Sequence, residues 1–265
     1  MRWNLKKYVK TLKLKTPVFI EGLPGIGNVG KIAIDVVIEE TKAQKILTFA
    51  SDQLPNTVFV NEQNLIELPK IEMYYKKIKG QDFLFMSGDV QPMTEQASYE
   101  FCRVVLKALH GYRCKKLITL GGIGLNQIPK SPKVFCTGNA KTFIQEFVPY
   151  KVHTNLYGVV GPIVGVSGLL LGLADPYGIQ ATSLLAETFG HPIYIGFKGA
   201  RELLRILNEK YKLDLGVQKL DQEIKGAYEE FERLQAGLPL TDEPQKKVSK
   251  YVQKLGRSKE TSYIG

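Results

Sequence analysis

A glycine-rich turn, FIEGLPGIGNVGK, is the stretch of the sequence whose residue types and spacing most directly point to chemistry. Gly25, Gly27 and Gly30 have the G-x-G-x-x-G spacing of a dinucleotide-binding turn. Lys31 follows the third glycine, as a lysine does in a phosphate loop. Asp52 comes about 20 residues later, where an acid that binds a ribose is expected. One interpretation is therefore a small-molecule or nucleotide-binding enzyme that uses these five residues.

Two features of the same stretch favour a structural turn between a strand and a helix over a phosphate-binding turn. A phosphate loop follows its lysine with Ser or Thr, whose hydroxyl binds magnesium, and here Ile32 follows Lys31. Pro24 precedes the first glycine and removes a backbone N–H where a phosphate-binding loop needs donors. We expect the glycines mainly to let a strand and a helix approach closely. Nucleotide binding stays the alternative.

The other candidate catalytic groups do not form a set. The stretch GVSGL at residues 165–169 lacks the second glycine of a nucleophile elbow, and His191 is the single histidine that follows it. The expected strand ends carry mostly Gly, Asn, Pro and Ser, so no general acid and base are apparent. We therefore predict a protein that is not an enzyme and that uses no cofactor and no metal.

The composition is that of a globular protein with a basic surface. The 265 residues are 44% hydrophobic and carry a formal net charge of +10. The basic residues are spread along the chain, which favours a solvated surface over a specific nucleic-acid site. Cys102, Cys114 and Cys136 form no C-x-x-C pair, so we expect buried thiols in a reducing cytoplasm. The uncharged stretch Tyr157–Ala174 contains five glycines and a proline, which favours a strand, a turn and a buried helix over a membrane span.

Apolar runs and periodicity predict an α/β fold. We expect a three-layer α/β/α arrangement with a mainly parallel, mixed sheet, because strands alternate with helices along the chain. Helices are predicted at residues 28–41 and 94–110, with Thr94 as the N-cap of the latter, and a further helix is predicted after residue 139. Strands are predicted at residues 17–20, 45–51, 115–124, 133–139 and 192–197, with hairpin strands between residues 57 and 86.

The C-terminal part of the chain differs in character from the globular domain, which we place at residues 1–215. Residues 216–237 are predicted to form an amphipathic helix with a narrow apolar seam, typical of a helix that packs on one partner helix. The seam residues, which are candidate oligomer contacts, are Val217, Leu220, Ile224, Phe231 and Leu234. Residues 238–265 are polar and basic, and we expect a mobile tail.

Several segments resemble the proteasome-assembly-chaperone family in its archaeal branch. They cover roughly residues 16–211. The most specific are the segment that begins with PVFIEG and the segment that begins with GPIVGV. The segments are PVFIEGLPGIGNVGKIAID, KLITLGGIG, PKVFCTGNA, GPIVGVSGLLLGLADPYGIQATSLLAET and GARELLRILNEKY.

The resemblance implies a fold related to nucleoside-phosphorylase-like proteins, with no established catalytic site. It also implies a homo-oligomer that binds α-subunits of the proteasome core particle. In this family a C-terminal tail that ends in a hydrophobic residue, Tyr and any residue docks on the α-ring. This chain ends with Ser262, Tyr263, Ile264 and Gly265, so Tyr263 is third from the end and no hydrophobic residue precedes it. By resemblance, Tyr263, Ile264 and Gly265 are the candidate partner-binding residues.

Overall fold

The fold is given by a computed structural model that describes residues 3–61, 63–157, 161–192 and 194–216. The predicted seam helix and the predicted tail therefore lie outside the described residues, except for Gly216. These two predictions include all the candidate oligomer contacts and the three candidate partner-binding residues at the end of the chain.

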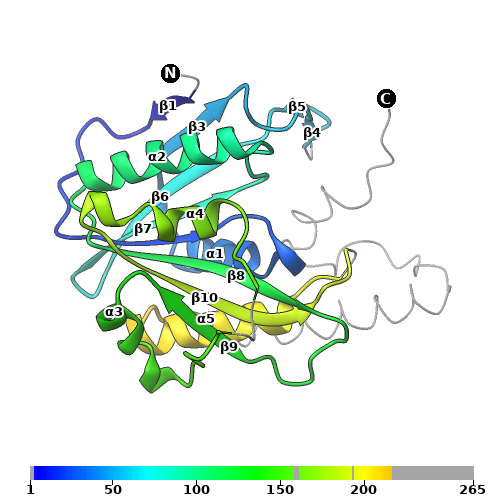
Figure 1. Ribbon diagram of the computed structural model, residues 1–265. Helices are drawn as coiled ribbons and strands as arrows, with labels where there is room; N and C mark the ends of the chain where they lie inside the picture. The colour runs from blue at the N-terminus through cyan, green and yellow to red at the C-terminus, as the bar shows by residue number, and fades with distance from the viewer. Residues whose placement is uncertain (1–2, 62, 158–160, 193, 217–265) are drawn as a thin grey trace, which may run out of the picture.

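The core of the molecule is one eight-stranded mixed sheet (Figure 1). Its four central strands run parallel as β7–β2–β8–β10, and the outer pairs on both sides are antiparallel. In spatial order the strands are β1 (Trp3–Lys7), β3 (Gln44–Ser51), β6 (Ile71–Ile78), β7 (Gln81–Gly88), β2 (Val18–Gly22), β8 (Lys116–Leu125), β10 (Gln180–Phe189) and β9 (Val134–Gly138).

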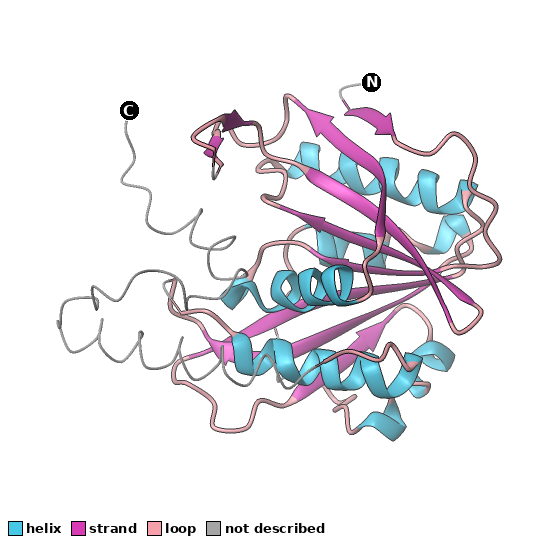
Figure 2. Ribbon diagram, turned by 180° about the vertical axis from the view of Figure 1, so that it is seen from behind, coloured by secondary structure: helices cyan, strands magenta, loops and turns pink. Residues whose placement is uncertain are grey.

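Helices cover both faces of this sheet, as the sequence predicts for a three-layer fold. The helices α1 (Val29–Glu40), α3 (Lys141–Gln145) and α5 (Phe197–Tyr211) pack on one face, and Figure 2 shows α1 and α5 in front of the strands. The helices α2 (Glu95–Gly111) and α4 (Val166–Gly172) pack on the other face (Figure 1). Each layer is joined to the sheet by alternating strand residues: Ile20 of β2 faces α1, and Phe19 faces α2.

Local signals explain several element boundaries. The Thr94 side chain accepts a hydrogen bond of 3.1 Å from the backbone N–H of Ala97, which confirms Thr94 as the N-cap of α2. The hairpin between β6 and β7 turns at Lys79 and Gly80, both of which have positive φ angles. The described residues also form three short 3₁₀ helices: η1 (Ile26–Asn28), η2 (Val148–Tyr150) and η3 (Asp175–Tyr177).

The sheet differs from the prediction at its edges. The basic N-terminal stretch, not predicted as regular structure, forms β1, an edge strand that pairs antiparallel with β3. Its lysines face solvent at the sheet edge, a pattern that hides the strand from a search for apolar runs. Part of the predicted hairpin region forms a separate two-stranded sheet of β4 (Phe59–Val60) and β5 (Ile66–Glu67), which stands apart from the main sheet in Figure 1.

Two predictions about the later strands are wrong. The described residues between 192 and 196 form a turn and a loop that lead into α5, not a core strand. The core strand of this region is β10, which lies between β8 and β9 and is almost fully buried, so it lacks the alternation of a half-exposed strand. Residues 161–165 are also loop, where the start of the apolar stretch predicts a strand. In the part of the chain that is described, no helix is long and apolar enough to cross a membrane.

Candidate functional site

The glycine turn joins β2 to α1 through very short contacts. A Cβ atom on Gly30 would be 2.2 Å from the carbonyl oxygen of Leu120 in the neighbouring strand β8. Gly27 has a φ angle of 60°, and a Cβ atom there would be 2.8 Å from the Thr188 hydroxyl oxygen. The carbonyl oxygen of Gly27 accepts a 2.8 Å hydrogen bond from the backbone N–H of Gly196. Packing therefore accounts for both glycines without a bound phosphate.

Gly25 is the exception in this turn. It has an extended backbone, and no atom lies within 4 Å of the position that its Cβ would take. Its carbonyl oxygen accepts a hydrogen bond from the backbone N–H of Asn28, which closes the short η1 helix. Gly25 thus makes none of the close approaches that Gly27 and Gly30 require.

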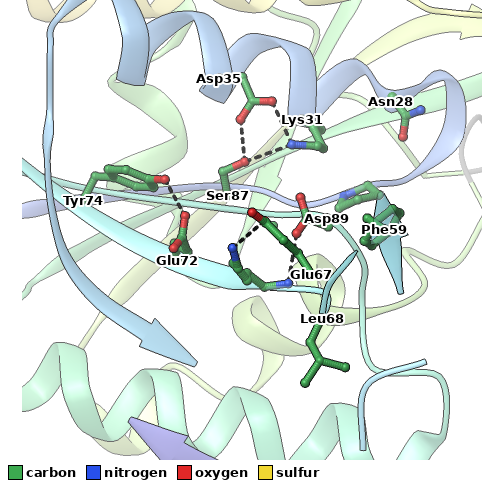
Figure 3. Close-up of a pocket in the computed structure, with 13 residues that line it drawn as sticks. Asn28, Lys31, Asp35, Phe59, Glu67, Leu68, Glu72, Tyr74, Ser87 and Asp89 are labelled. Carbon is green, nitrogen blue, oxygen red and sulfur yellow. Dashed lines mark hydrogen bonds and ion pairs between the residues drawn. The ribbon is translucent and has the colours of Figure 1, made fainter. Parts of the chain in front are cut away.

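Lys31 is buried at 6% exposure and is committed to a network with two neighbouring side chains. Its Nζ lies 2.7 Å from Oδ2 of Asp35, one turn later in α1, and 3.3 Å from Oγ of Ser87 in β7. The Ser87 hydroxyl donates a 2.5 Å hydrogen bond to Oδ1 of Asp35, which closes the triangle (Figure 3). The ammonium group therefore anchors α1 to β7 and does not reach across the glycine turn.

Asp52, the proposed ribose-binding acid, lies far from the turn. It is exposed and follows β3, and the strands β6 and β7 lie between β3 and β2. Three strand spacings correspond to about 14 Å. A dinucleotide site needs its acidic residue on the strand beside the glycine turn. The structure thus separates Asp52 from the other four residues of the nucleotide-binding interpretation.

A cavity of about 240 Å³ opens beside Lys31, at the carboxyl ends of β2 and β7. The helix that follows β2 covers one face of the sheet, and the helix that follows β7 covers the other face. This reversal is a topological switch point, the usual position of ligand sites in open α/β sheets. The β4–β5 hairpin contributes Phe59, Glu67 and Leu68 to the wall of the cavity (Figure 3).

Charged side chains line most of this cavity. Its carboxylates are Asp35, Glu67, Glu72 and Asp89, and its ammonium groups belong to Lys31 and Lys70. Besides the Lys31–Asp35 pair, Lys70 pairs with Glu67 at 2.7 Å, and Lys45, outside the lining, pairs with Glu72 at 2.9 Å. Excess negative charge therefore surrounds the cavity, an environment that disfavours the phosphate groups of a nucleotide.

The hydrogen bonds of Glu72 set the ionisation of two groups in the cavity wall. Burial alone would raise the pKa of Glu72, but hydrogen bonds from Tyr74 and Lys45 outweigh it and hold the pKa below the usual value. Burial and the charge of Glu72 raise the pKa of Tyr74, whose hydroxyl donates a 2.7 Å hydrogen bond to that carboxylate. Glu72 is thus a stable carboxylate, and Tyr74 is a neutral donor.

A second titratable group, Glu21, lies at the end of β2 on the opposite face of the sheet. Its side chain is fully buried, and the carboxylate accepts hydrogen bonds from the Leu23 backbone N–H (2.8 Å) and the Ser167 hydroxyl (3.0 Å). Burial raises the pKa of Glu21 to about 7, although both hydrogen bonds act to lower it. Because Ser167 lies in α4, this carboxyl group ties the end of β2 to that helix.

A model of the PAC2 family matches residues 19–235, which is most of the chain. The chain belongs to the PAC2 family. The Methanocaldococcus jannaschii protein MJ0106 is 31% identical over 222 residues, which cover 82% of this chain and 85% of that protein.

Two solved structures from Pyrococcus furiosus share the fold. PbaB, described as an archaeal proteasome activator, superposes with a TM-score of 0.80 at 27% identity, covering 89% of this chain and 100% of PbaB. PbaA, described as an archaeal homolog of proteasome-assembly chaperone, gives a TM-score of 0.74 at 24% identity, covering 89% of this chain and 93% of PbaA. The resemblance and the α/β fold predicted from the sequence are thereby confirmed.

The sequence did not predict most of the residues that line the cavity of this PAC2 protein. The expectation that the strand ends carry almost no acidic side chains is also wrong. Glu21 is the fourth residue of β2, and Asp89 directly follows β7. A polar SGD stretch after the apolar run FLFM is a signal that could have identified the end of β7. The spacing of Lys31 and Asp35, four residues apart on one helix face, was also readable. Nothing local indicates that Glu72 joins them.

Proposed function

We propose that this protein is a non-catalytic, homo-oligomeric proteasome-assembly-chaperone-like factor that binds α-subunits of the proteasome core particle. The observation that carries the proposal is the similarity to PbaB, which extends over the whole of that protein at 27% identity. The proteasome is therefore the partner that we assign, and the α-subunits are the part of it that the family resemblance favours.

Two predicted segments supply the contacts in this proposal. The seam helix at residues 216–237 joins copies of the chain, and the tail at residues 238–265 carries Tyr263 to the partner. Several tails on one symmetric oligomer act at a high effective concentration, so individually weak contacts add up to firm binding. The globular body then serves as the platform that holds the tails together.

The state of the titratable groups supports a non-catalytic role. Glu21, whose pKa burial raises to about 7, is sealed in the interior away from the cavity. Lys31 and Asp35 are held by each other and by Ser87, so their charges serve the fold. The cysteines Cys102, Cys114 and Cys136 are buried free thiols, which supports a place in the reducing cytoplasm.

Native mass spectrometry of the full chain with purified proteasome α-subunits tests this function. We expect a complex that contains more than one copy of this chain and that weakens when residues 241–265 are removed. Tyr263→Ala is expected to weaken it, whereas the matched control Tyr251→Ala in the same tail is expected to leave it unchanged. Absence of a complex at every mixing ratio would contradict the proposal.

A further inference from the structure

Two polar side chains at the charged cavity lack the partners that their neighbours have. Asn28 is buried at 8% exposure, lines the cavity, and makes no side-chain hydrogen bond with any described residue. Asp89 accepts the backbone N–H of Lys70 at 2.9 Å but forms no ion pair in the described part of the chain. Figure 3 shows both residues among the side chains around the cavity.

The position of Asn28 makes its free amide notable. It is the N-cap residue of α1, yet its side chain does not cap the helix, and its φ angle of 52° lies in the left-handed region. An amide group that has no protein partner and lines a cavity needs a ligand or water to complete its hydrogen bonds. The amide offers one acceptor and two donors to an occupant of the cavity.

The charges around the cavity determine whether it favours a positively or a negatively charged ligand. Four carboxylates and two ammonium groups line it, and one of these carboxylates, Glu72, is compensated from outside the lining by Lys45. One negative charge remains, and Asp89 is the carboxylate without a direct ion pair among the described residues, because Lys31 and Lys70 pair with Asp35 and Glu67 and act on Asp89 only at longer range. This local excess stands out in a chain whose net charge is +10. A cation gains from this field, and an anion is repelled.

The walls and the volume limit the size of the occupant. Pro24, Phe59 and Leu68 give the cavity an apolar side, and Leu68 is 72% exposed. The volume of about 240 Å³ is below the roughly 300–1,000 Å³ of sites for drug-sized ligands. The Lys31–Asp35–Ser87 network holds another part of the wall in place through hydrogen bonds within the protein.

We propose that this cavity binds a single ammonium or guanidinium group carried on a short aliphatic stem. The cationic head donates hydrogen bonds to the Asp89 carboxylate and to the side-chain oxygen of Asn28. The stem packs on Phe59 and Leu68. This ligand site is separate from the contacts assigned to the proteasome, so either proposal stands if the other fails.

Such a cationic group has two sources, a free small amine or an arginine or lysine side chain of a bound protein. Isothermal titration calorimetry of the full chain distinguishes them with two probes. Agmatine represents the free small molecule, and N-acetyl-arginine N-methylamide represents a side chain on a peptide backbone. Binding of agmatine alone assigns the site to a free amine, and binding of the blocked arginine assigns it to a protein side chain.

Three variants locate the binding. Asp89→Asn removes the charge and keeps the shape, and we expect the Kd to rise about tenfold or more, as for the loss of a charge-assisted hydrogen bond. Asn28→Gly removes the amide at a left-handed position that glycine adopts freely, and a severalfold rise is expected. Asp52→Asn makes the same chemical change at an exposed site outside the cavity and is expected to leave the Kd unchanged.

Thermal unfolding of each variant shows first that it is folded. The control for the sign of the charge is AMP, which is an anion. AMP titrated alone is expected to give no saturable heat, and its presence is expected to leave the binding of agmatine to the cavity unchanged. The proposal is overturned if neither cationic probe binds the wild-type chain, or if Asp89→Asn and Asn28→Gly both bind as the wild type does. Saturable binding of AMP at the cavity would likewise overturn it.

Discussion

The Cα atom of Gly30 lies so close to the carbonyl oxygen of Leu120 that a Cβ atom on residue 30 would be 2.2 Å from that oxygen. Because Gly30 is in α1 and Leu120 is in β8, this contact sets how near the first helix can come to the centre of the sheet. A Cβ on Gly22 would likewise be 2.2 Å from the carbonyl oxygen of Gly30. Helix and strands therefore meet backbone to backbone at the glycine turn.

Gly30→Ala is expected to destabilise the protein by about 3 kcal/mol, because the new methyl group meets backbone that cannot move aside. Helix propensity alone predicts the opposite, a gain of about 1 kcal/mol for alanine over glycine. Gly25→Ala is the matched control, since no atom lies within 4 Å of its Cβ position, and its effect should be below about 1 kcal/mol. Urea unfolding at neutral pH measures both changes. Equal stabilities for the two variants would refute the packing role of Gly30.

The buried pair of Lys31 and Asp35 gives a prediction about coupling. Their side chains are 8% and 10% exposed, so removing one partner leaves the other charge buried. Lys31→Met and Asp35→Leu are each expected to lower the free energy of unfolding by about 3 kcal/mol. The double variant should lose much less than the sum of the two, because no unpaired charge remains. A double-mutant cycle in urea measures this coupling.

The exposed pair of Lys79 and Asp214 provides the comparison for that cycle. Its side chains are 55% and 75% exposed, with the charged atoms 2.9 Å apart. Asp214→Asn should change the free energy of unfolding by less than about 1 kcal/mol, as for other surface ion pairs. If Lys31→Met and Asp35→Leu also changed the free energy of unfolding by less than about 1 kcal/mol, the network beside the cavity would not anchor α1 to β7. The same conclusion would follow if the effects of the two substitutions simply added in the double variant.

The sequence was informative wherever one segment carries its own signal. The turn before α1 combines glycines, a preceding apolar strand and a following amphipathic pattern, and the structure contains the predicted strand, turn and helix there. The N-cap and apolar face of α2 were readable for the same reason. The strand β10 was missed because burial on both faces removes the alternation that marks a strand.

The cavity was not predictable in the same way because its residues come from separate segments. Lys31 lies in α1, Ser87 is the second-to-last residue of β7, and Glu72 lies in β6. Only the strand order β6–β7–β2 makes them neighbours, and that order depends on long-range pairing. The buried Glu21 was overlooked for a related reason: its partner Ser167 is 146 residues away. Local patterns indicate which elements form but not which polar side chains meet.

The seam helix predicted at residues 216–237 leads to a test of oligomerisation. Leu220→Glu combined with Phe231→Glu places two charges on the predicted apolar seam, so we expect the oligomer to dissociate, because a buried unpaired charge is strongly unfavourable. Size-exclusion chromatography with light scattering should show a fall in molar mass toward the 29.7 kDa of one chain. Glu223→Gln, between the seam positions, is the control. An unchanged mass for the double variant would show that these residues do not hold the copies together.

The buried carboxyl of Glu21 gives the stability of the fold a distinct pH dependence. Its pKa in the folded chain is about 7, against 4.5 for an unperturbed glutamate, so between these values the folded state holds a proton that the unfolded state has lost. The stabilising contribution is thus complete below pH 4.5 and is lost as the pH rises through 7. A shift of this size corresponds to about 3 kcal/mol.

Glu21→Gln removes this titration while keeping the size of the side chain and an oxygen that accepts the Leu23 N–H. Relative to the wild type, the variant should become more stable by about 3 kcal/mol as the pH is raised from 4.5 to 8. Urea unfolding at several pH values measures this difference, and Glu95→Gln, at an exposed position, should show no such trend between pH 5 and 8. Because the Ser167 hydroxyl lowers the pKa of Glu21, Ser167→Ala should shift the wild-type transition to higher pH. A difference between Glu21→Gln and the wild type that stays constant over this range would mean that Glu21 is ionised in the folded protein throughout.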